Sequence, residues 1–295
     1  MHQALGITSY PGFIATRSFG TVWPESPDLR QFDYIICYCQ FGDSYILLDA
    51  ASKYRPYGLI PPECLVETVY LINGNESSLV RVRHLQLTSF RTDRTVVNID
   101  EIGTAACSTV CQMGGYDAAQ YAQMAERYSS DEFIQKKFLD KMGFDYDLSN
   151  HETYLDEAGN FVIEFDYQLA DLVTMFGANE SIAQTTFVYR SNPFYRQKRF
   201  FPIDFQYPFT YTNIMEVHLS ETGPDIELPP NLDYSFMANS FVRQSELRDS
   251  TIFVVQKLTI AEPLINELNY SHLREFFSQL VSACEDRVTV AGSTN

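Results

Sequence analysis

Between residues 66 and 265, apolar and polar side chains alternate with a period of two in many short runs, which are bounded by Gly, Asn, Asp or Pro. Such alternation places one face of each run in a core and the other in water, as in half-buried β-strands. The predicted strands are 66–72, 84–90, 96–99, 161–169, 185–189, 214–219 and 251–260. The pattern therefore predicts a mostly antiparallel, β-sandwich-like domain.

Two helices are predicted within this β-rich region. Ser129 and Glu132 have the spacing of a capping box, and Gly143 ends the run that starts near residue 131. The second helix lies near the C-terminus and has apolar residues three and four positions apart, which form one helix face. These residues are Leu273, Phe276, Phe277, Leu280, Val281 and Cys284. We expect this face to dock onto the sheet.

The first part of the chain has a different organisation. Segments 10–16, 32–40 and 45–50 read as strands, and 41–44 reads as the hairpin turn between the last two. The next segment, 55–62, holds three prolines and a glycine, so it predicts an irregular crossing. We place a domain boundary just after it. The prediction is an α+β protein with one domain at 1–65 and a second at 66–295.

Charge and cysteine usage exclude several classes of function. The chain has 38 acidic and 21 basic residues and a formal net charge of −17, which argues against a nucleic-acid partner. Its apolar runs are too short for a membrane span. The six cysteines and five histidines show no complete metal-ligand spacing, although Cys37 and Cys39 lie two apart on one strand face. We predict no metal site and no cofactor.

Four features follow one another in the first part of the chain in a recognisable order. They are Thr16-Arg17, Phe32-Asp33-Tyr34-Ile35, Tyr45-Ile46-Leu47-Leu48-Asp49-Ala50 and Pro56-Tyr57-Gly58-Leu59-Ile60-Pro61. Their order resembles the second half of the bacterial transglutaminase-like domain, which has a papain-related fold. The later motifs Asn192-Pro193-Phe194 and Arg199-Phe200-Phe201-Pro202-Ile203-Asp204-Phe205, with the last helix, resemble the β-rich domain of unknown function that follows such domains in Bacteroides-type proteins.

The resemblance implies a catalytic triad whose positions this chain fills only in part. Asp49 falls where the triad carboxylate belongs, but Tyr34 falls where the family has His, and the segment that would carry the Cys is absent. A thiol nucleophile needs a neighbouring base, and a tyrosine with a reference pKa near 10 is a poor substitute for an imidazole. Strand parity directs Cys37 away from Tyr34. Asp49 also has a structural interpretation, because an aspartate at a strand end often caps the next turn.

Segment 194–209 combines seven aromatic residues with Arg196, Lys198 and Arg199. Interleaved basic and aromatic residues can bind glycans, anions or single-stranded nucleic acid. In an acidic chain we favour an aromatic strand pair whose cations pair with nearby carboxylates. The opening segment 1–6 resembles the last turn of a helix, which suggests a piece of a longer chain.

Three functions remain open at this point. The preferred hypothesis is a non-catalytic, degenerate transglutaminase-like module (a pseudoenzyme) that binds a protein, peptide or glycan, or that has a structural role. The alternatives are a fragment of an active cysteine protease or transglutaminase-like enzyme whose nucleophile lies upstream, and a carbohydrate-binding module. The resemblance implies a bacterial periplasmic or extracellular location. A truncated N-terminal piece would expose sheet edges and apolar surface, so we expect it to pack on the β domain or to form a homo-oligomer.

Overall fold

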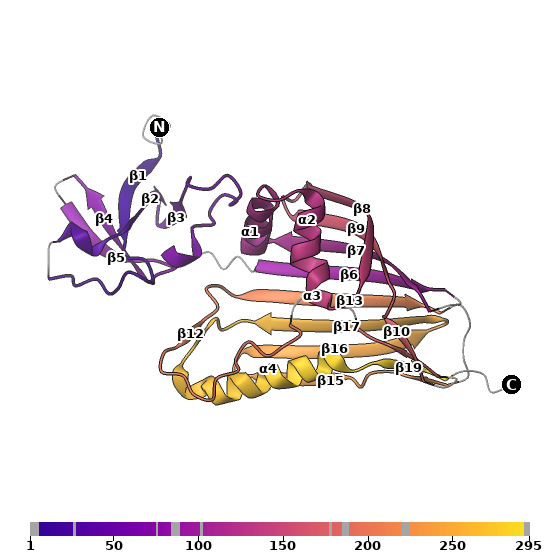
Figure 1. Ribbon diagram of the computed structural model, residues 1–295. Coiled ribbons are helices and arrows are strands. Elements are labelled where there is room, and N and C mark those ends of the chain that lie inside the picture. The colour runs from indigo at the N-terminus through magenta and orange to yellow at the C-terminus, as the bar shows by residue number, and fades with distance from the viewer. Residues whose placement is uncertain are drawn as a thin grey trace. The chain divides into compact units, whose positions relative to one another are not determined.

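The computed structural model describes residues 6–25, 28–74, 76–83, 89–100, 103–176, 179–184, 189–219 and 225–291. The chain divides into two compact units, Met1–Thr88 and Ser89–Asn295. Figure 1 shows the elements of both. The predicted helix end at 1–6 lies largely outside the described residues, as do most of the predicted strands 84–90 and 185–189.

The first unit is built on an antiparallel sheet with the strand order β3-β2-β1-β4-β5. Its strands are β1 (Thr8–Ile14), β2 (Tyr34–Phe41), β3 (Ser44–Leu48), β4 (Thr68–Asn73) and β5 (Glu76–Arg81). The predicted hairpin between β2 and β3 is confirmed, with Phe41 opposite Ser44 and a positive φ of 59° at Gly42. Glycine adopts this left-handed conformation without steric cost.

The division between the units lies between residues 88 and 89, later than the boundary predicted near residue 66. The reason is strand pairing. Strand β4 joins β1, with Phe13 opposite Tyr70, and β5 then pairs with β4. Local polarity patterns could not show this, because they place a strand in a sheet without naming its neighbour. A core of mostly aliphatic side chains, among them Ile14, Ile36 and Val69, holds this sheet.

The second unit contains an eight-stranded sheet in the order β15-β16-β17-β13-β6-β7-β9-β8. Its strands are β6 (Ser89–Ile99), β7 (Ala105–Gly114), β8 (Tyr146–Leu155), β9 (Phe161–Leu169), β13 (Phe209–His218), β15 (Leu232–Phe236), β16 (Asn239–Arg248) and β17 (Thr251–Ile260). Strands β13 and β6 run parallel, and the other neighbours in this sheet are antiparallel. The predicted strands 161–169 and 251–260 coincide with β9 and β17.

Two smaller sheets complete the second unit. A four-stranded sheet, β10-β11-β19-β14, contains β10 (Val173–Phe176), β11 (Asn179–Ile182), β14 (Ile226–Glu227) and β19 (Val288–Val290). A short antiparallel pair joins β12 (Ile203–Asp204) to β18 (Leu264–Ile265). Together these sheets confirm the α+β class with mainly antiparallel strands.

Helices cover one face of the large sheet (Figure 1). They are α1 (Gly115–Ala125), α2 (Ser130–Ile134), α3 (Asp140–Met142) and α4 (Tyr270–Glu285), with a π-helical turn at Gln135–Leu139 between α2 and α3. The predicted cap is confirmed, because the Ser129 hydroxyl accepts a hydrogen bond from the Glu132 amide at 3.4 Å. Gly143 ends this helical run with a φ of 67°. Helix α1 begins after Gly114 with no side-chain cap, so its start lacked a sequence signal.

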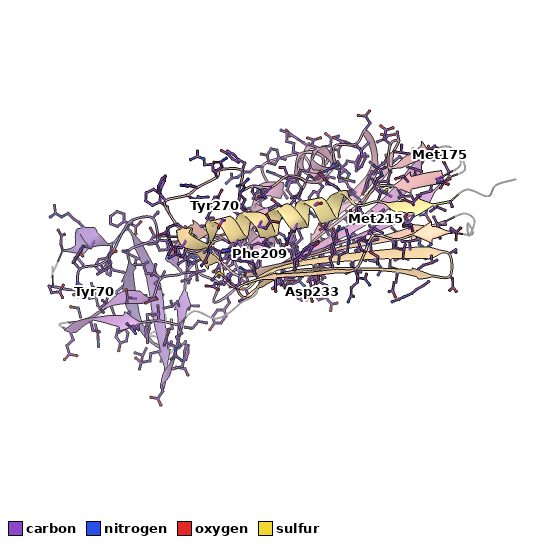
Figure 2. The ribbon with its side chains drawn as sticks, turned by 90° about the horizontal axis from the view of Figure 1, so that it is seen from below. Tyr70, Met175, Phe209, Met215, Asp233 and Tyr270 are labelled. Carbon is purple, nitrogen blue, oxygen red and sulfur yellow. The ribbon has the colours of Figure 1, made fainter. Side chains whose placement is uncertain are left out.

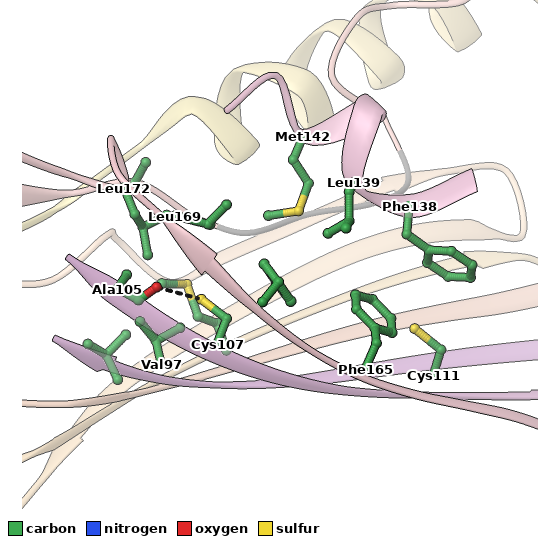
Figure 3. Packing of buried hydrophobic residues seen from close by; sticks show 14 of the residues in the cluster. Val97, Ala105, Cys107, Cys111, Phe138, Leu139, Met142, Phe165, Leu169 and Leu172 are labelled. Atoms are coloured by element: carbon green, nitrogen blue, oxygen red, sulfur yellow. Dashed lines mark hydrogen bonds between the residues drawn. The ribbon is translucent and has the colours of Figure 1, made fainter. Parts of the chain in front are cut away.

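Two apolar clusters fill the second unit. One lies beneath α1 to α3 and includes Phe138, Phe165, Cys107 and Cys111 (Figure 3). The other lies beneath α4, where the predicted apolar stripe is confirmed as a docking face with Leu273, Phe276, Phe277 and Leu280 buried. Figure 2 places Tyr270 at the start of this helix and Phe209 nearby in the sheet. The cluster under α4 is rich in aromatic residues.

Candidate functional site

The structure brings Tyr34 and Asp49 together in the first unit. Tyr34 begins β2, and Asp49 directly follows β3, the hairpin partner of β2. Burial, together with Asp49 as a nearby negative charge and hydrogen-bond partner, raises the pKa of the Tyr34 phenol to about 12. At neutral pH, Tyr34 is therefore a neutral phenol that cannot serve as a general base.

Asp49 has two partners besides Tyr34. Its Oδ2 atom pairs with the Arg55 guanidinium, and its Oδ1 atom accepts a hydrogen bond from the Ala51 amide at 3.2 Å. The second contact is the turn-capping role that the sequence suggested. The Asp49 side chain is only 6% exposed. The carboxylate therefore orients the turn and neutralises a partly buried cation.

Cys64 is the cysteine that the fold brings near this pair. It ends a short 3₁₀ helix (Pro62–Cys64), and its thiol interacts electrostatically with Tyr34 and Asp49. Cys64 is fully buried, and burial, followed by the charge of Glu63, raises its pKa to about 12. Thiolate is the nucleophilic form of cysteine, so the thiol at this position is inert at neutral pH.

Four further cysteines have raised pKa values. Burial raises the pKa of Cys39 and Cys284 to about 11 and that of Cys107 to about 12, and it raises the pKa of Cys111 strongly. Cys37 and Cys39 share a strand face, as predicted, with their sulfur atoms 3.5 Å apart. Within the described residues, no group of three or more His, Cys, Asp and Glu side chains is placed to hold a metal ion.

A groove in the first unit is a second candidate site, and the sequence did not predict it. It measures about 440 Å³ and lies between segment 22–32 and strands β4 and β5. Its lining includes Trp23, Phe32 and Tyr70, with Ser77 and Ser78 from β5. This volume falls in the range of clefts that bind small molecules or short peptide segments.

The groove is formed by ordered contacts. The Trp23 amide donates to Gln31 Oε1 at 2.6 Å, which holds Trp23 beside Gln31. Phe32 stacks on Tyr70 with ring centroids 5.4 Å apart, and the Tyr70 hydroxyl donates to Ser77 Oγ at 2.8 Å. These contacts fix an apolar floor, formed by the rings of Phe32 and Tyr70, beside the polar side chain of Ser77. Trp23, the single tryptophan of the chain, remains 68% exposed at the rim.

Segment 194–209 does not form the predicted strand pair. Residues 194–202 are irregular, β12 pairs with β18, and β13 starts only at Phe209. Arg196, Lys198 and Arg199 are exposed and form no ion pair with any carboxylate in the described part of the chain. The prediction of paired cations is therefore wrong. The aromatic residues of the segment are divided between the core and the surface.

Comparison with known proteins finds a family model that matches only part of the chain. Residues 179–290 match the family model DUF3858, described as a domain of unknown function with a solved structure. This match confirms the resemblance of the C-terminal region to a domain of unknown function. It covers less than half of the chain. No curated protein matches the sequence.

One solved structure is distantly similar to this chain. It is a crystal structure described as a candidate protease from Parabacteroides distasonis, with 10% sequence identity and a TM-score of 0.48. The alignment covers 98% of this chain but 41% of that protein, so the chain spans less than half of its length.

Among the described helices, none is long and apolar enough to cross a membrane.

Proposed function

We propose that this chain is a non-catalytic binding module whose first unit takes an extended peptide segment of a protein partner in the Trp23 groove. The observation that carries the proposal is the groove itself, with a stacked aromatic floor and one exposed tryptophan at its rim. Exposed aromatic residues anchor many interfaces because they contribute a large contact area at low entropic cost.

The position of β5 favours a peptide over other ligands. Strand β5 ends the order β3-β2-β1-β4-β5, and within the described residues it pairs only with β4. An edge strand offers backbone donors and acceptors that an extended peptide can pair with. Ser77 and Ser78 of β5 line the groove, so the edge and the aromatic floor belong to one site.

The degenerate triad supports the non-catalytic part of the proposal. Tyr34 occupies the position where the transglutaminase-like family has His, and its raised pKa keeps it neutral. The nearby Cys64 is buried and protonated at neutral pH. In this proposal the module functions outside the bacterial cytoplasm, as a pseudoenzyme of that family.

Trp23 provides the readout for a direct test. A library of extended ten-residue peptides is titrated against the chain while the emission of Trp23 is followed. We expect some peptides to change the emission, and we expect Tyr70→Ala to weaken their binding at least tenfold, since stacking with Phe32 is lost. Tyr70→Phe keeps the ring and should bind nearly as well as the wild type.

The matched control is Tyr57→Ala, because Tyr57 is 72% exposed in the same unit and does not line the groove. Its affinity for the peptides should equal that of the wild type. If no peptide changes Trp23 emission at millimolar concentration, the peptide proposal fails. Oligosaccharides titrated in parallel form the second arm, and a response to them alone would assign the groove to a glycan.

An active enzyme is the second candidate, favoured by the proximity of Cys64 to Tyr34 and Asp49. Alkylation with iodoacetamide separates the two functions. In a non-catalytic module, Cys64 should react far more slowly than an unfolded cysteine at every pH below about 9, because the thiol is buried and protonated. Rapid, selective labelling of Cys64 in the native protein would favour the enzyme instead. Loss of labelling in Cys64→Ser would identify the reacting residue.

A further inference from the structure

The surface segment Tyr195–Phe201 in the second unit plays no part in the groove. Three of its aromatic side chains are strongly exposed, Tyr195 at 76%, Phe200 at 83% and Phe201 at 77%. Large apolar side chains gathered on a surface mark an interaction site, whereas single ones are ordinary. The segment is therefore a candidate docking surface.

The segment is held firmly at its base. Phe194 is buried with its ring 4.8 Å from that of Phe277 in α4, and the Asn192 side chain donates to the Arg274 carbonyl at 2.9 Å. The Tyr270 hydroxyl donates to the Arg196 carbonyl, also at 2.9 Å. The core thus fixes the backbone while the neighbouring side chains point outward. A surface ordered in advance loses little entropy on binding.

Two further apolar residues extend this surface. Leu264, 53% exposed, lies opposite Asp204 in the β12–β18 pair and so close to the end of the segment. Leu268, 82% exposed, precedes Tyr270 by two residues. We call the exposed apolar residues Tyr195, Phe200, Phe201, Leu264 and Leu268, together with Arg196, Lys198 and Arg199, the aromatic–basic patch.

Segment 195–201 carries positive charge in an acidic chain, whereas Asp204, Glu262 and Glu267 lie beside Leu264 and Leu268. Arg196, Lys198 and Arg199 bring three positive charges into a protein with a net charge of −17. A negatively charged partner is attracted at this patch and repelled by the acidic surface elsewhere, so the charges also orient it.

We propose that the aromatic–basic patch docks the second unit onto the surface of an anionic phospholipid membrane. Phe and Tyr partition into the interfacial region, and Lys and Arg beside them contact lipid phosphates. The high exposure of Phe200 and Phe201, which are adjacent in sequence, favours a lipid surface over a rigid protein surface as the partner. Lipid can surround both rings, whereas one rigid protein face would have to provide a separate pocket for each.

Vesicle sedimentation of the full chain tests this proposal. Vesicles of phosphatidylcholine with about one third phosphatidylglycerol should sediment the protein, and the bound fraction should fall as salt screens the charges. Vesicles of phosphatidylcholine alone should sediment at least five-fold less protein. The double variant Phe200→Ser, Phe201→Ser should lower binding to the anionic vesicles at least ten-fold. Replacing Arg196, Lys198 and Arg199 by Ser should abolish the preference for anionic lipid.

The control is the double variant Leu155→Ser, Met175→Ser, which removes exposed apolar side chains elsewhere in the second unit (64% and 57% exposed). It should bind vesicles like the wild type, and circular dichroism should show that all variants fold. Absence of sedimentation with anionic vesicles, or equal loss in the control variant, would overturn the proposal. Binding of an acidic protein through the patch without vesicle binding would also overturn it, in favour of a protein partner.

Discussion

In the first unit, Phe32 and Tyr70 stack beside an open groove, whereas in the second unit Phe194, Phe205 and Phe277 pack ring against ring beneath α4. The same kind of residue thus contributes to a surface in one unit and to a core in the other. The first unit has a small, mostly aliphatic core, and the second has two large clusters. We infer that the larger aromatic core makes the second unit the more stable of the two, while the first unit presents the proposed peptide groove.

The largest expected effect is on the stability of the second unit when Phe277 is truncated. Phe277 is fully buried and contacts Phe194, Tyr189 and Phe276. Phe277→Ala should lower the free energy of unfolding of this unit by about 3–5 kcal/mol, because a cavity replaces a packed ring. Hydrogen exchange, followed in peptides from each unit at increasing urea concentrations, measures the free energy of unfolding of each unit separately. Phe200→Ala, a change of an exposed ring, is the control and should have little effect.

The comparison between the units fails if Phe277→Ala also destabilises β2 and β3. Their peptides should keep the wild-type urea midpoint, since the two units have separate cores. An equal shift in both units would mean that they unfold as one cooperative structure.

The next effect concerns Arg243, a fully buried cation of strand β16 whose side chain contacts the C-terminal end of α4. Its guanidinium donates to the carbonyl oxygens of Ala283 and Pro230 and pairs with Asp286 at 2.7 Å. Arg243→Leu removes the donor to Pro230 and the partner of Asp286 and leaves the Ala283 carbonyl with Gln184 as its donor, so we expect a loss of about 3 kcal/mol in the free energy of unfolding.

A matched control for this variant is Arg248→Leu. Arg248 pairs with Glu246 on the surface and is 65% exposed, so its loss should cost no more than about 0.5 kcal/mol. Urea unfolding of both variants measures the difference. Similar midpoints for the two variants would show that the buried pair contributes no more than a surface pair.

A smaller, pH-dependent effect is expected at Asp117. Burial raises the pKa of this carboxyl, although Ser89 Oγ and the Tyr211 hydroxyl donate to it at 2.8 and 3.1 Å. The folded state therefore binds the proton more tightly than the unfolded chain. The resulting stabilisation is complete below the unfolded pKa, near 3.9, and is lost as pH rises through the folded pKa.

Asp117→Asn removes this titration. Relative to the variant, the wild type should lose stability as the pH is raised from about 4 toward neutrality, in the direction set by the raised pKa. Urea midpoints of both proteins across this range give the difference directly. A difference that does not change with pH would show that Asp117 titrates alike in the folded and unfolded chains.

The smallest effect is expected in the groove. Trp23→Ala removes a side chain that is 68% exposed, so the free energy of unfolding of the first unit should change by less than about 0.5 kcal/mol. Hydrogen exchange of the β1 to β5 peptides measures it. A loss as large as that expected for Phe277→Ala would make Trp23 a core residue and would remove the contrast between the two units.

Much of the secondary structure could be predicted from local pattern. The period-two runs at 161–169 and 251–260 became β9 and β17, the Ser129 cap begins α2, and the apolar stripe of α4 docks as expected. These features depend on side chains within a few residues of one another, so the sequence contains the whole signal. Helix α1 lacked such a signal, because Gly114 precedes it and no side chain caps it.

The contacts of the candidate site also fall into those that the sequence predicts and those that only the structure shows. The hairpin turn set by Gly42 brings β2 and β3 together, and the sequence was sufficient to connect Tyr34 with Asp49 through the family resemblance. Only the tertiary structure decided that Cys64 lies near this pair and that Tyr70 lies beneath Phe32, because those contacts join segments tens of residues apart. Polarity patterns fix which face of a strand is buried, but strand order and the packing of loops depend on the competition among all pairings in the folded chain.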